Sequence, residues 1–168
     1  MLFSRISADS GMPHVAIRAV CLALFLLPVS EGTVASEQKA NYFDDPFLQV
    51  TSGIPDCPPQ QGPMITEAEM RTEAHSRAER GTSCYQSGRC RLPNAYLYDK
   101  EIVPRVKIAI LATGRFADTS VWAEGRRRWV WLKGCVRARA EADALVRMVR
   151  GIDDVEAVVD ELVVKKRR

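Results

Sequence analysis

Residues 121–164 read VWAEGRRRWVWLKGCVRARAEADALVRMVRGIDDVEAVVDELVV. Side-chain character alternates in Val121–Glu124 and in Trp129–Val136, on either side of a Gly-Arg-Arg-Arg turn, which predicts a β-hairpin. Apolar residues in Ala138–Arg150 recur at helical spacing, and a glycine follows where that helix would stop. Val155–Val164 is rich in β-branched residues and predicts a further strand. The unit is therefore strand–strand–helix–strand, in which the helix must cover one face of a small sheet.

Glycine and hydrophobic positions recur at fixed spacing through this unit. They are Gly125, Val130, Leu132, Gly134 and Val136 in the hairpin, and Gly151, Ile152, Val155, Val158, Leu162 and Val164 after the helix. Together with a preceding helix expected near Glu101–Ala112, the pattern resembles the BON domain, a small module of bacterial envelope proteins. The resemblance implies an α+β fold of αββαβ order, with a three-stranded mixed sheet and two helices on one face. It also implies a binding role, often at phospholipid surfaces. It does not imply an enzyme, and we expect no cofactor.

The N-terminus has the pattern of a secretory signal peptide. Basic residues precede an apolar run of eleven residues, Ala19–Val29, and the small residues of Thr33–Ala35 offer a cleavage site. The run is too short to cross a bilayer core of about 30 Å as a helix. A buried apolar helix of a cytosolic protein is the alternative. Because Cys21 precedes the apolar run instead of following it, lipidation is disfavoured. We expect residues 1–35 to be removed and the protein to be periplasmic.

Four cysteines follow the expected leader, and an even number in an exported protein favours two disulfide bonds, with three possible connectivities. The Ser-Gly within the segment CYQSGRC allows a tight turn, which favours pairing Cys84 with Cys90 and leaves Cys57 with Cys135. A zinc site is disfavoured, because no Cys-x-x-Cys is present and His75 is the only histidine after the leader. We therefore expect no metal.

The remaining chain is long enough for one domain with a core. We expect a Pro-rich extended segment at 36–63 and a capped helix with the cystine loop at 64–98. The BON-like domain follows at 99–164, and a basic tail at 165–168. The Pro-rich segment carries enough hydrophobic residues to lie across the domain surface, where Cys57 would attach it.

Two helices are expected before the hairpin. Thr66 and Glu69 have the spacing of a capping box, and Gly81 would end that polar surface helix. Asp99 could cap a second helix running to about residue 113, whose first turn is complicated by Pro104.

Alternation places Trp129, Trp131 and Cys135 on the sheet face opposite the expected core, where Trp122 can join them. We expect the Pro-rich segment to cover this face through Cys57, because the cysteine needs a partner. The last strand favours this cover, because its sequence is apolar on both faces. In the competing interpretation the tryptophans are exposed as an anchor at a membrane interface.

The formal net charge of +3 is mild, but it includes two basic runs, 126–128 and 165–168. Basic residues near an anionic surface each contribute about 1 kcal/mol of attraction. The residues expected to contact lipid or another anionic surface are Arg126, Arg127, Arg128, Trp129, Trp131, Lys165 and Lys166. Nucleic acid would suit the same charges, but an exported protein rarely meets it.

Three classes of function remain. The favoured one is a noncatalytic envelope module that binds phospholipid or another anionic envelope component. The alternative is a periplasmic protein–protein interaction or assembly module without lipid binding. An enzyme is disfavoured, because a single histidine after the leader allows few acid–base sets and Cys84-x5-Cys90 is not a redox motif.

Overall fold

The computed structural model describes residues 37–166, so the expected signal peptide at 1–35 and the last two residues of the basic tail lie outside the described part. The elements follow one another as β1 (Phe47–Gln49), α1 (Glu67–Gln86), a 3₁₀ turn, α2 (Asp99–Ala112), β2 (Ser120–Arg126), β3 (Trp129–Val136), α3 (Arg139–Arg150) and β4 (Ala157–Val164). From α2 onward this is the expected αββαβ order. Within the described range, no helix has the length and apolar character needed to cross a membrane.

The sheet has four strands in the order β1-β2-β3-β4, so the expectation of three strands was wrong. The hairpin β2–β3 is antiparallel, and β4 lies parallel to β3. The additional strand is β1, which comes from the Pro-rich segment and pairs antiparallel with β2, with Phe47 opposite Glu124. The segment continues along β2 beyond the strand, because the amide of Val50 donates to the carbonyl of Val121 at 2.8 Å.

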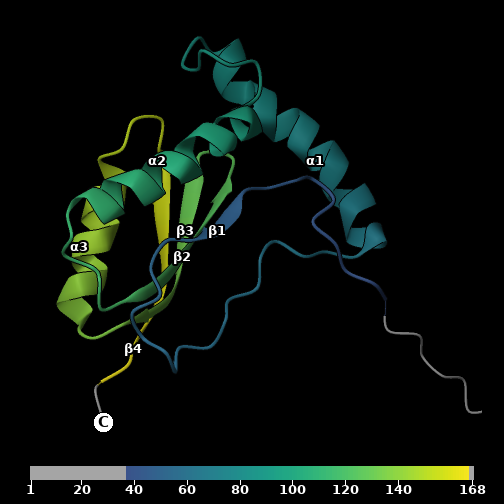
Figure 1. Ribbon diagram of the computed structural model, residues 1–168. Coiled ribbons are helices and arrows are strands. Elements are labelled where there is room, and N and C mark those ends of the chain that lie inside the picture. Colours follow the sequence, from purple (N-terminus) through teal and green to yellow (C-terminus); the bar gives the residue numbers. More distant parts are fainter. Residues whose placement is uncertain (1–36, 167–168) are drawn as a thin grey trace, which may run out of the picture. The chain divides into compact units, whose positions relative to one another are not determined.

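Helices α2 and α3 lie on the same face of the sheet (Figure 1). The core between them and the sheet contains most of the hydrophobic positions that carried the family resemblance, whereas Val164 is 39% exposed. Its fully buried side chains include Ile102, Val103, Val106, Val121, Val130, Leu132, Val136, Leu145 and Val149. The expected arrangement of two helices on one face is therefore confirmed.

Glycine is required at position 134 of β3, where the resemblance also has one. Gly134 has φ +114°, and a Cβ there would lie 2.2 Å from the backbone oxygen of Ser120 and 2.9 Å from the Trp122 ring. An amino acid with a side chain would fit neither this backbone conformation nor so close an approach of the neighbouring strand.

Strand β4 is not covered on both faces, contrary to expectation. Val158 and Leu162 face the core and are buried, whereas 63% of Val163 is exposed. The β4 strand forms one edge of the sheet, and Asp160 and Glu161 at its middle are exposed. Charged residues on an edge strand discourage pairing with another chain.

Helix α1 begins as predicted and ends later. The Thr66 side chain accepts from the Glu69 amide, and the Glu69 carboxylate accepts from the Thr66 amide at 2.8 Å, which completes the capping box. The helix continues through Gly81 to Gln86, so the expected stop at Gly81 was wrong. Gly81 is buried against Asn94, and a Cβ at this position would lie 2.4 Å from the Asn94 side chain. Its role is close packing, not termination.

Candidate functional site

The turn of the β2–β3 hairpin is built from two arginines in an unusual backbone conformation. Arg127 and Arg128 have φ of 57° and 67°, a left-handed region that asparagine and glycine adopt far more readily. The carboxylate of Asp99, at the start of α2, accepts hydrogen bonds from both of their backbone amides, at 2.6 and 2.7 Å. Asp99 therefore holds the turn in place.

Asp99 is completely buried under this turn. Burial raises its pKa to about 7, although the two amide hydrogen bonds act in the opposite direction by favouring the ionised form. The turn thus rests on a carboxyl group whose charge changes near neutral pH.

The side chains of the first two arginines lie over tryptophan rings. The guanidinium of Arg126 is 4.7 Å from the ring centre of Trp131, and that of Arg127 is 5.7 Å from the ring centre of Trp129. The two tryptophan rings are 6.1 Å apart and both are half-buried. Nε1 of Trp129 finds no hydrogen-bond acceptor among the described residues. The run therefore forms a mixed cationic and aromatic surface.

Arg128 turns the other way and is held more firmly. Its guanidinium donates to the carbonyl of Asp154 at 2.8 Å, lies 5.2 Å from the ring centre of Tyr98, and is 3.1 Å from the sulfur of Cys90. The Cys84–Cys90 pair, which has a Cα–Cα distance of 5.3 Å, is therefore in direct contact with the hairpin turn.

Helix α1 is held beside the hairpin by one buried arginine. Arg77 forms a two-pronged ion pair with Asp45, and both side chains are almost fully buried. Its guanidinium also lies between two aromatic rings, 3.8 Å from the centre of Phe43 and 4.4 Å from that of Tyr96, and bonds Glu73 at 2.9 Å. A planar guanidinium suits this combination of stacking and paired hydrogen bonds.

Two adjoining pockets separate α1 from the hairpin turn, and we call them together the arginine–tryptophan groove. Their volumes are about 330 and 400 Å³, and Arg80 and Arg127 line both. The first pocket is lined by Arg80, Ser83, Cys84, Arg89, Ala95, Arg127, Arg128 and Glu156. The second is lined by Glu73, Ser76, Arg80, Tyr96, Arg126, Arg127, Trp129 and Trp131.

The arginines of this groove are short of acidic partners. Most other arginines on α1 and α2 pair with a carboxylate, as Arg71 does with Glu67 and Arg105 with Asp154. In residues 37–166, no carboxylate oxygen lies within 4.0 Å of the guanidinium of Arg80, Arg89 or Arg127. The groove therefore presents positive charge that the described part of the chain does not neutralise.

Comparison with known protein families gives one match. The family model of the BON domain matches residues 98–166. The C-terminal part of the chain is a BON domain. No curated protein matches the chain. The matched region begins at Tyr98, so α1, the cystine loop and β1 are additions to the BON domain.

These additions contribute half of the groove. Arg126–Arg128 and both tryptophans belong to the BON domain, whereas Arg80 and Arg89 come from α1 and the cystine loop. The sequence analysis included only the BON-domain members. Arg80 was missed because helical periodicity predicts an exposed residue there, and nothing local shows which neighbour α1 packs against.

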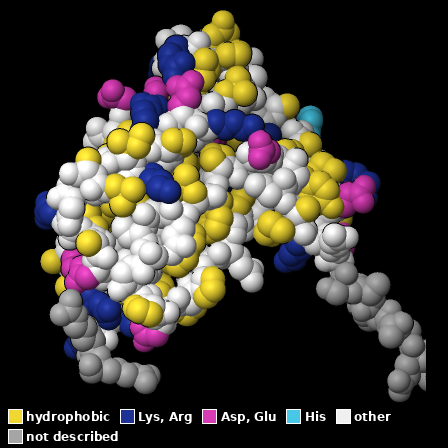
Figure 2. Space-filling model, viewed as in Figure 1, with side chains coloured by type: hydrophobic (Ala, Val, Ile, Leu, Met, Phe, Trp, Pro, Cys, Tyr) yellow, Lys and Arg dark blue, Asp and Glu magenta, His cyan; other side chains and the backbone are white. Residues whose placement is uncertain are grey.

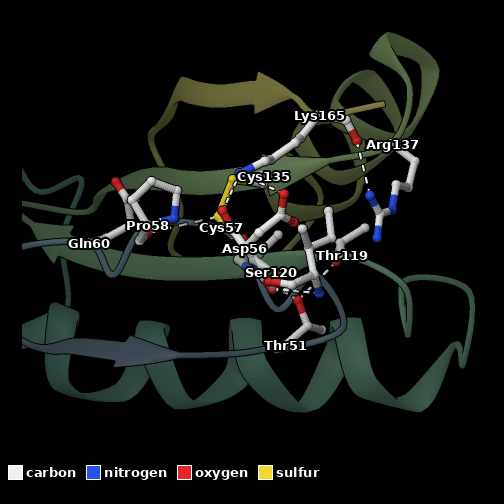
Figure 3. The surroundings of a disulfide bond; sticks show 12 residues. Thr51, Asp56, Cys57, Pro58, Gln60, Thr119, Ser120, Cys135, Arg137 and Lys165 are labelled. Atoms are coloured by element: carbon white, nitrogen blue, oxygen red, sulfur yellow. Dashed lines mark hydrogen bonds and ion pairs between the residues drawn. A yellow bond between two sulfur atoms is a disulfide. The ribbon is translucent and has the colours of Figure 1, made fainter. Parts of the chain in front are cut away.

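The second basic run lies elsewhere on the BON domain. Trp129 pairs with Ala157 at one end of β3, and the amide of Lys165 donates to Val136 at the other end, about 23 Å away at the rise of an extended strand. Nζ of Lys165 lies 3.1 Å from the carboxylate of Asp56 (Figure 3). Lys166 is exposed. The two runs therefore do not form one surface. Figure 2 shows the basic side chains of the face in view in small separate groups.

The Pro-rich extension covers half of the open face of the BON sheet. Cys57 and Cys135 approach with a Cα–Cα distance of 5.8 Å, and they pack in one buried cluster with Ile54 and Trp122. The side chain of Ser120 fixes the same segment, since it accepts from the Ile54 amide at 2.8 Å and donates to the Ile54 carbonyl (Figure 3). The expected cover thus reaches Trp122, whereas the remaining two tryptophans line the groove.

Within residues 37–166, no group of three or more histidine, cysteine or acidic side chains is arranged to hold a metal ion. A further, mostly apolar cavity of about 360 Å³ lies on the other side of α1 and includes Phe43, Pro46, Ala74, Tyr96 and Leu97. Its charged side chains pair with one another, Arg77 with Asp45 and Lys100 with Asp44.

Proposed function

We propose that this protein is a noncatalytic module that binds an anionic component of the cell envelope, such as anionic phospholipid, through the arginine–tryptophan groove. The BON domain suggests an envelope or phospholipid-binding role. The observation that carries the proposal is the juxtaposition of unneutralised arginines with two half-exposed tryptophans. Arginine attracts phosphate, and tryptophan favours the interface between water and hydrocarbon.

The proposal includes export to the periplasm. The apolar run Ala19–Val29 has the length of a signal-peptide core. The two cysteine pairs at bonding distance suit an oxidising compartment, where disulfide bonds persist. In such a compartment the groove would face anionic lipid head groups and envelope proteins, and little nucleic acid.

Co-sedimentation of the oxidised protein with liposomes tests this function. We expect pelleting with vesicles containing phosphatidylglycerol, none with neutral phosphatidylcholine, and loss of pelleting at high salt, because the attraction is screened. The variant Arg80→Gln/Arg127→Gln should bind several-fold more weakly. Its matched control, Arg115→Gln/Arg150→Gln, removes the same charge from exposed residues outside the groove and should bind like the parent.

Failure to pellet under any of these conditions would refute lipid binding. It would favour the protein–protein alternative, for which α2 offers a surface. Ile108 and Leu111 on this helix are 68% and 49% exposed, in the face that does not contact the core. Equal loss of binding in the two double variants would show that total charge, and not the groove, is responsible.

A further inference from the structure

The first pocket of the arginine–tryptophan groove, which contains Arg80 and Arg89, is enclosed by four separate parts of the chain. The last turns of α1 contribute Arg80 and Ser83, and the cystine loop contributes Arg89. The hairpin turn contributes Arg127 and Arg128, and the residue before β4 contributes Glu156. We call this pocket of about 330 Å³ the arginine cup. Its walls come from residues far apart in sequence, so its geometry depends on the folded state.

Contacts within the protein hold the backbone and side chains of the cup in place without a ligand. Asp99 fixes the backbone of both turn arginines, and Arg128 is held by the Asp154 carbonyl and the Tyr98 ring. The Cys84–Cys90 pair closes the loop that carries Arg89, whose Nε also donates to Ser87 at 3.0 Å. Preorganised donors lose less conformational entropy when they bind.

The positive charge of the cup exceeds the negative charge of the one acidic residue that lines it, Glu156. Four guanidinium groups line it, and its single carboxylate is that of the exposed Glu156. Arg128 has no carboxylate within 4.0 Å in the described residues, and neither has any of the other three. Like charges so close together repel one another, and a ligand carrying about two negative charges would relieve the repulsion.

We propose that the arginine cup binds a phosphate monoester. This group carries a charge of about −1.5 to −2 near neutral pH and presents three acceptor oxygens, which matches several guanidinium donors from different directions. A phosphodiester carries one charge and is blocked by substituents on two sides. The inference rests on the proposed function in using the same groove, and it adds the chemical class of the group that the groove selects. The group can be a lipid head group or a soluble phosphate.

Titration of the oxidised protein by calorimetry provides the first measurement, with glycerol 3-phosphate as the soluble probe. We expect saturable binding that weakens about tenfold in Arg80→Gln/Arg89→Gln, where two of the charge-assisted contacts are lost. Both side chains are exposed, so their replacement should leave the fold intact, which circular dichroism would check. The Arg115→Gln/Arg150→Gln control should bind like the parent.

A third variant raises the net positive charge of the cup instead of lowering it. Glu156→Gln removes the only carboxylate that lines the cup, so binding of glycerol 3-phosphate should become several-fold tighter. Binding that is unchanged in this variant and in Arg80→Gln/Arg89→Gln would overturn the assignment of the cup.

Vesicles distinguish the two sources of the phosphate. Vesicles with phosphatidic acid carry a monoester, and vesicles with phosphatidylglycerol a diester; the two should be prepared with equal surface charge. Stronger pelleting with phosphatidic acid, reduced in Arg80→Gln/Arg89→Gln, would support the lipid source. Binding of glycerol 3-phosphate without any pelleting would support the cup and refute lipid binding. Equal pelleting with both lipids, and no saturable binding of glycerol 3-phosphate, would overturn the cup while leaving the proposed function standing.

Discussion

The two cysteine pairs should differ in their effect on stability. Cys57–Cys135 closes a loop of 78 residues, whereas Cys84–Cys90 closes one of 6. In the chain-entropy model, a cross-link stabilises the fold by restricting the unfolded chain, and the effect grows with the logarithm of loop length. The model gives about 4.5 kcal/mol for the long loop and about 2 kcal/mol for the short one.

Packing adds to the difference. Cys57 and Cys135 are 8% and 4% exposed, and they share a buried cluster with Ile54 and Trp122. Replacing both cysteines by alanine would leave space in this cluster and would also free the Pro-rich extension from the sheet. The Cys84 and Cys90 side chains are half-buried, so their replacement loses less packing, although it also removes the contact of Cys90 with Arg128.

Urea unfolding measures both effects, with tryptophan fluorescence reporting on the Trp122 cluster. We expect Cys57→Ala/Cys135→Ala to lower the free energy of unfolding by at least about 4 kcal/mol, and Cys84→Ala/Cys90→Ala by about 2 kcal/mol. Equal losses in the two variants would refute the reasoning, as would a larger loss from the short loop. Peptide mapping without reduction that links Cys57 to Cys84 or Cys90 would refute the pairing itself.

Three further predictions concern buried groups. Because the pKa of Asp99 is raised to about 7, the folded protein keeps a proton that the unfolded chain loses above about pH 4. The contribution of Asp99 to stability is therefore complete below about pH 4 and falls by about 1.4 kcal/mol per pH unit up to about pH 7. Urea unfolding at several pH values should show this slope in the parent and a smaller slope in Asp99→Asn. Arg77→Met leaves the Asp45 carboxylate buried without its partner and should cost about 3 kcal/mol, part of which Arg77→Met/Asp45→Asn should recover. In Gly134→Ala, the new Cβ would lie 2.2 Å from the Ser120 carbonyl oxygen at a residue with φ +114°. We expect this variant to lose more than about 2 kcal/mol of stability, which would lower its melting temperature. Thermal unfolding by circular dichroism that matches the parent would contradict the last prediction.

The elements predicted best from the sequence are those defined by local pattern. The bounds of β3, Trp129–Val136, and the capping box of α1 at Thr66 and Glu69 agree with the structure. Strand alternation separated the buried Val130 and Leu132 from the tryptophan face. Each of these features depends on residues within one strand or one helical turn, so sequence spacing contains the necessary information.

The features that were missed depend on contacts between distant residues. Strand β1 has three residues and forms only because β2 offers its edge, and no alternation predicts so short a strand. The hairpin was recognised, but its predicted turn of four residues was two residues too long, because Gly125 and Arg126 belong to β2 and arginine is uncommon at the positive φ of the remaining two. Asp99, which makes that conformation possible, lies 28 positions from Arg127. The buried pair of Arg77 with Asp45 spans 32 positions, and neither residue type is usually buried.

The additions to the BON domain explain how its open sheet face is divided. In a three-stranded sheet with two helices on one side, the tryptophans and Cys135 would all face solvent, which is unfavourable for so much apolar surface. The Pro-rich segment adds β1 and then runs along β2 away from the hairpin turn, so the cluster in which it removes Trp122 from water lies at the other end of the strands. Helix α1, fixed by Arg77, then stands beside that turn without filling the space between them. One addition therefore stabilises the sheet, and the other encloses a groove whose arginines come from both parts of the chain. Because both parts of the chain line the groove, its ligand has to be sought with the complete protein and not with the BON domain alone.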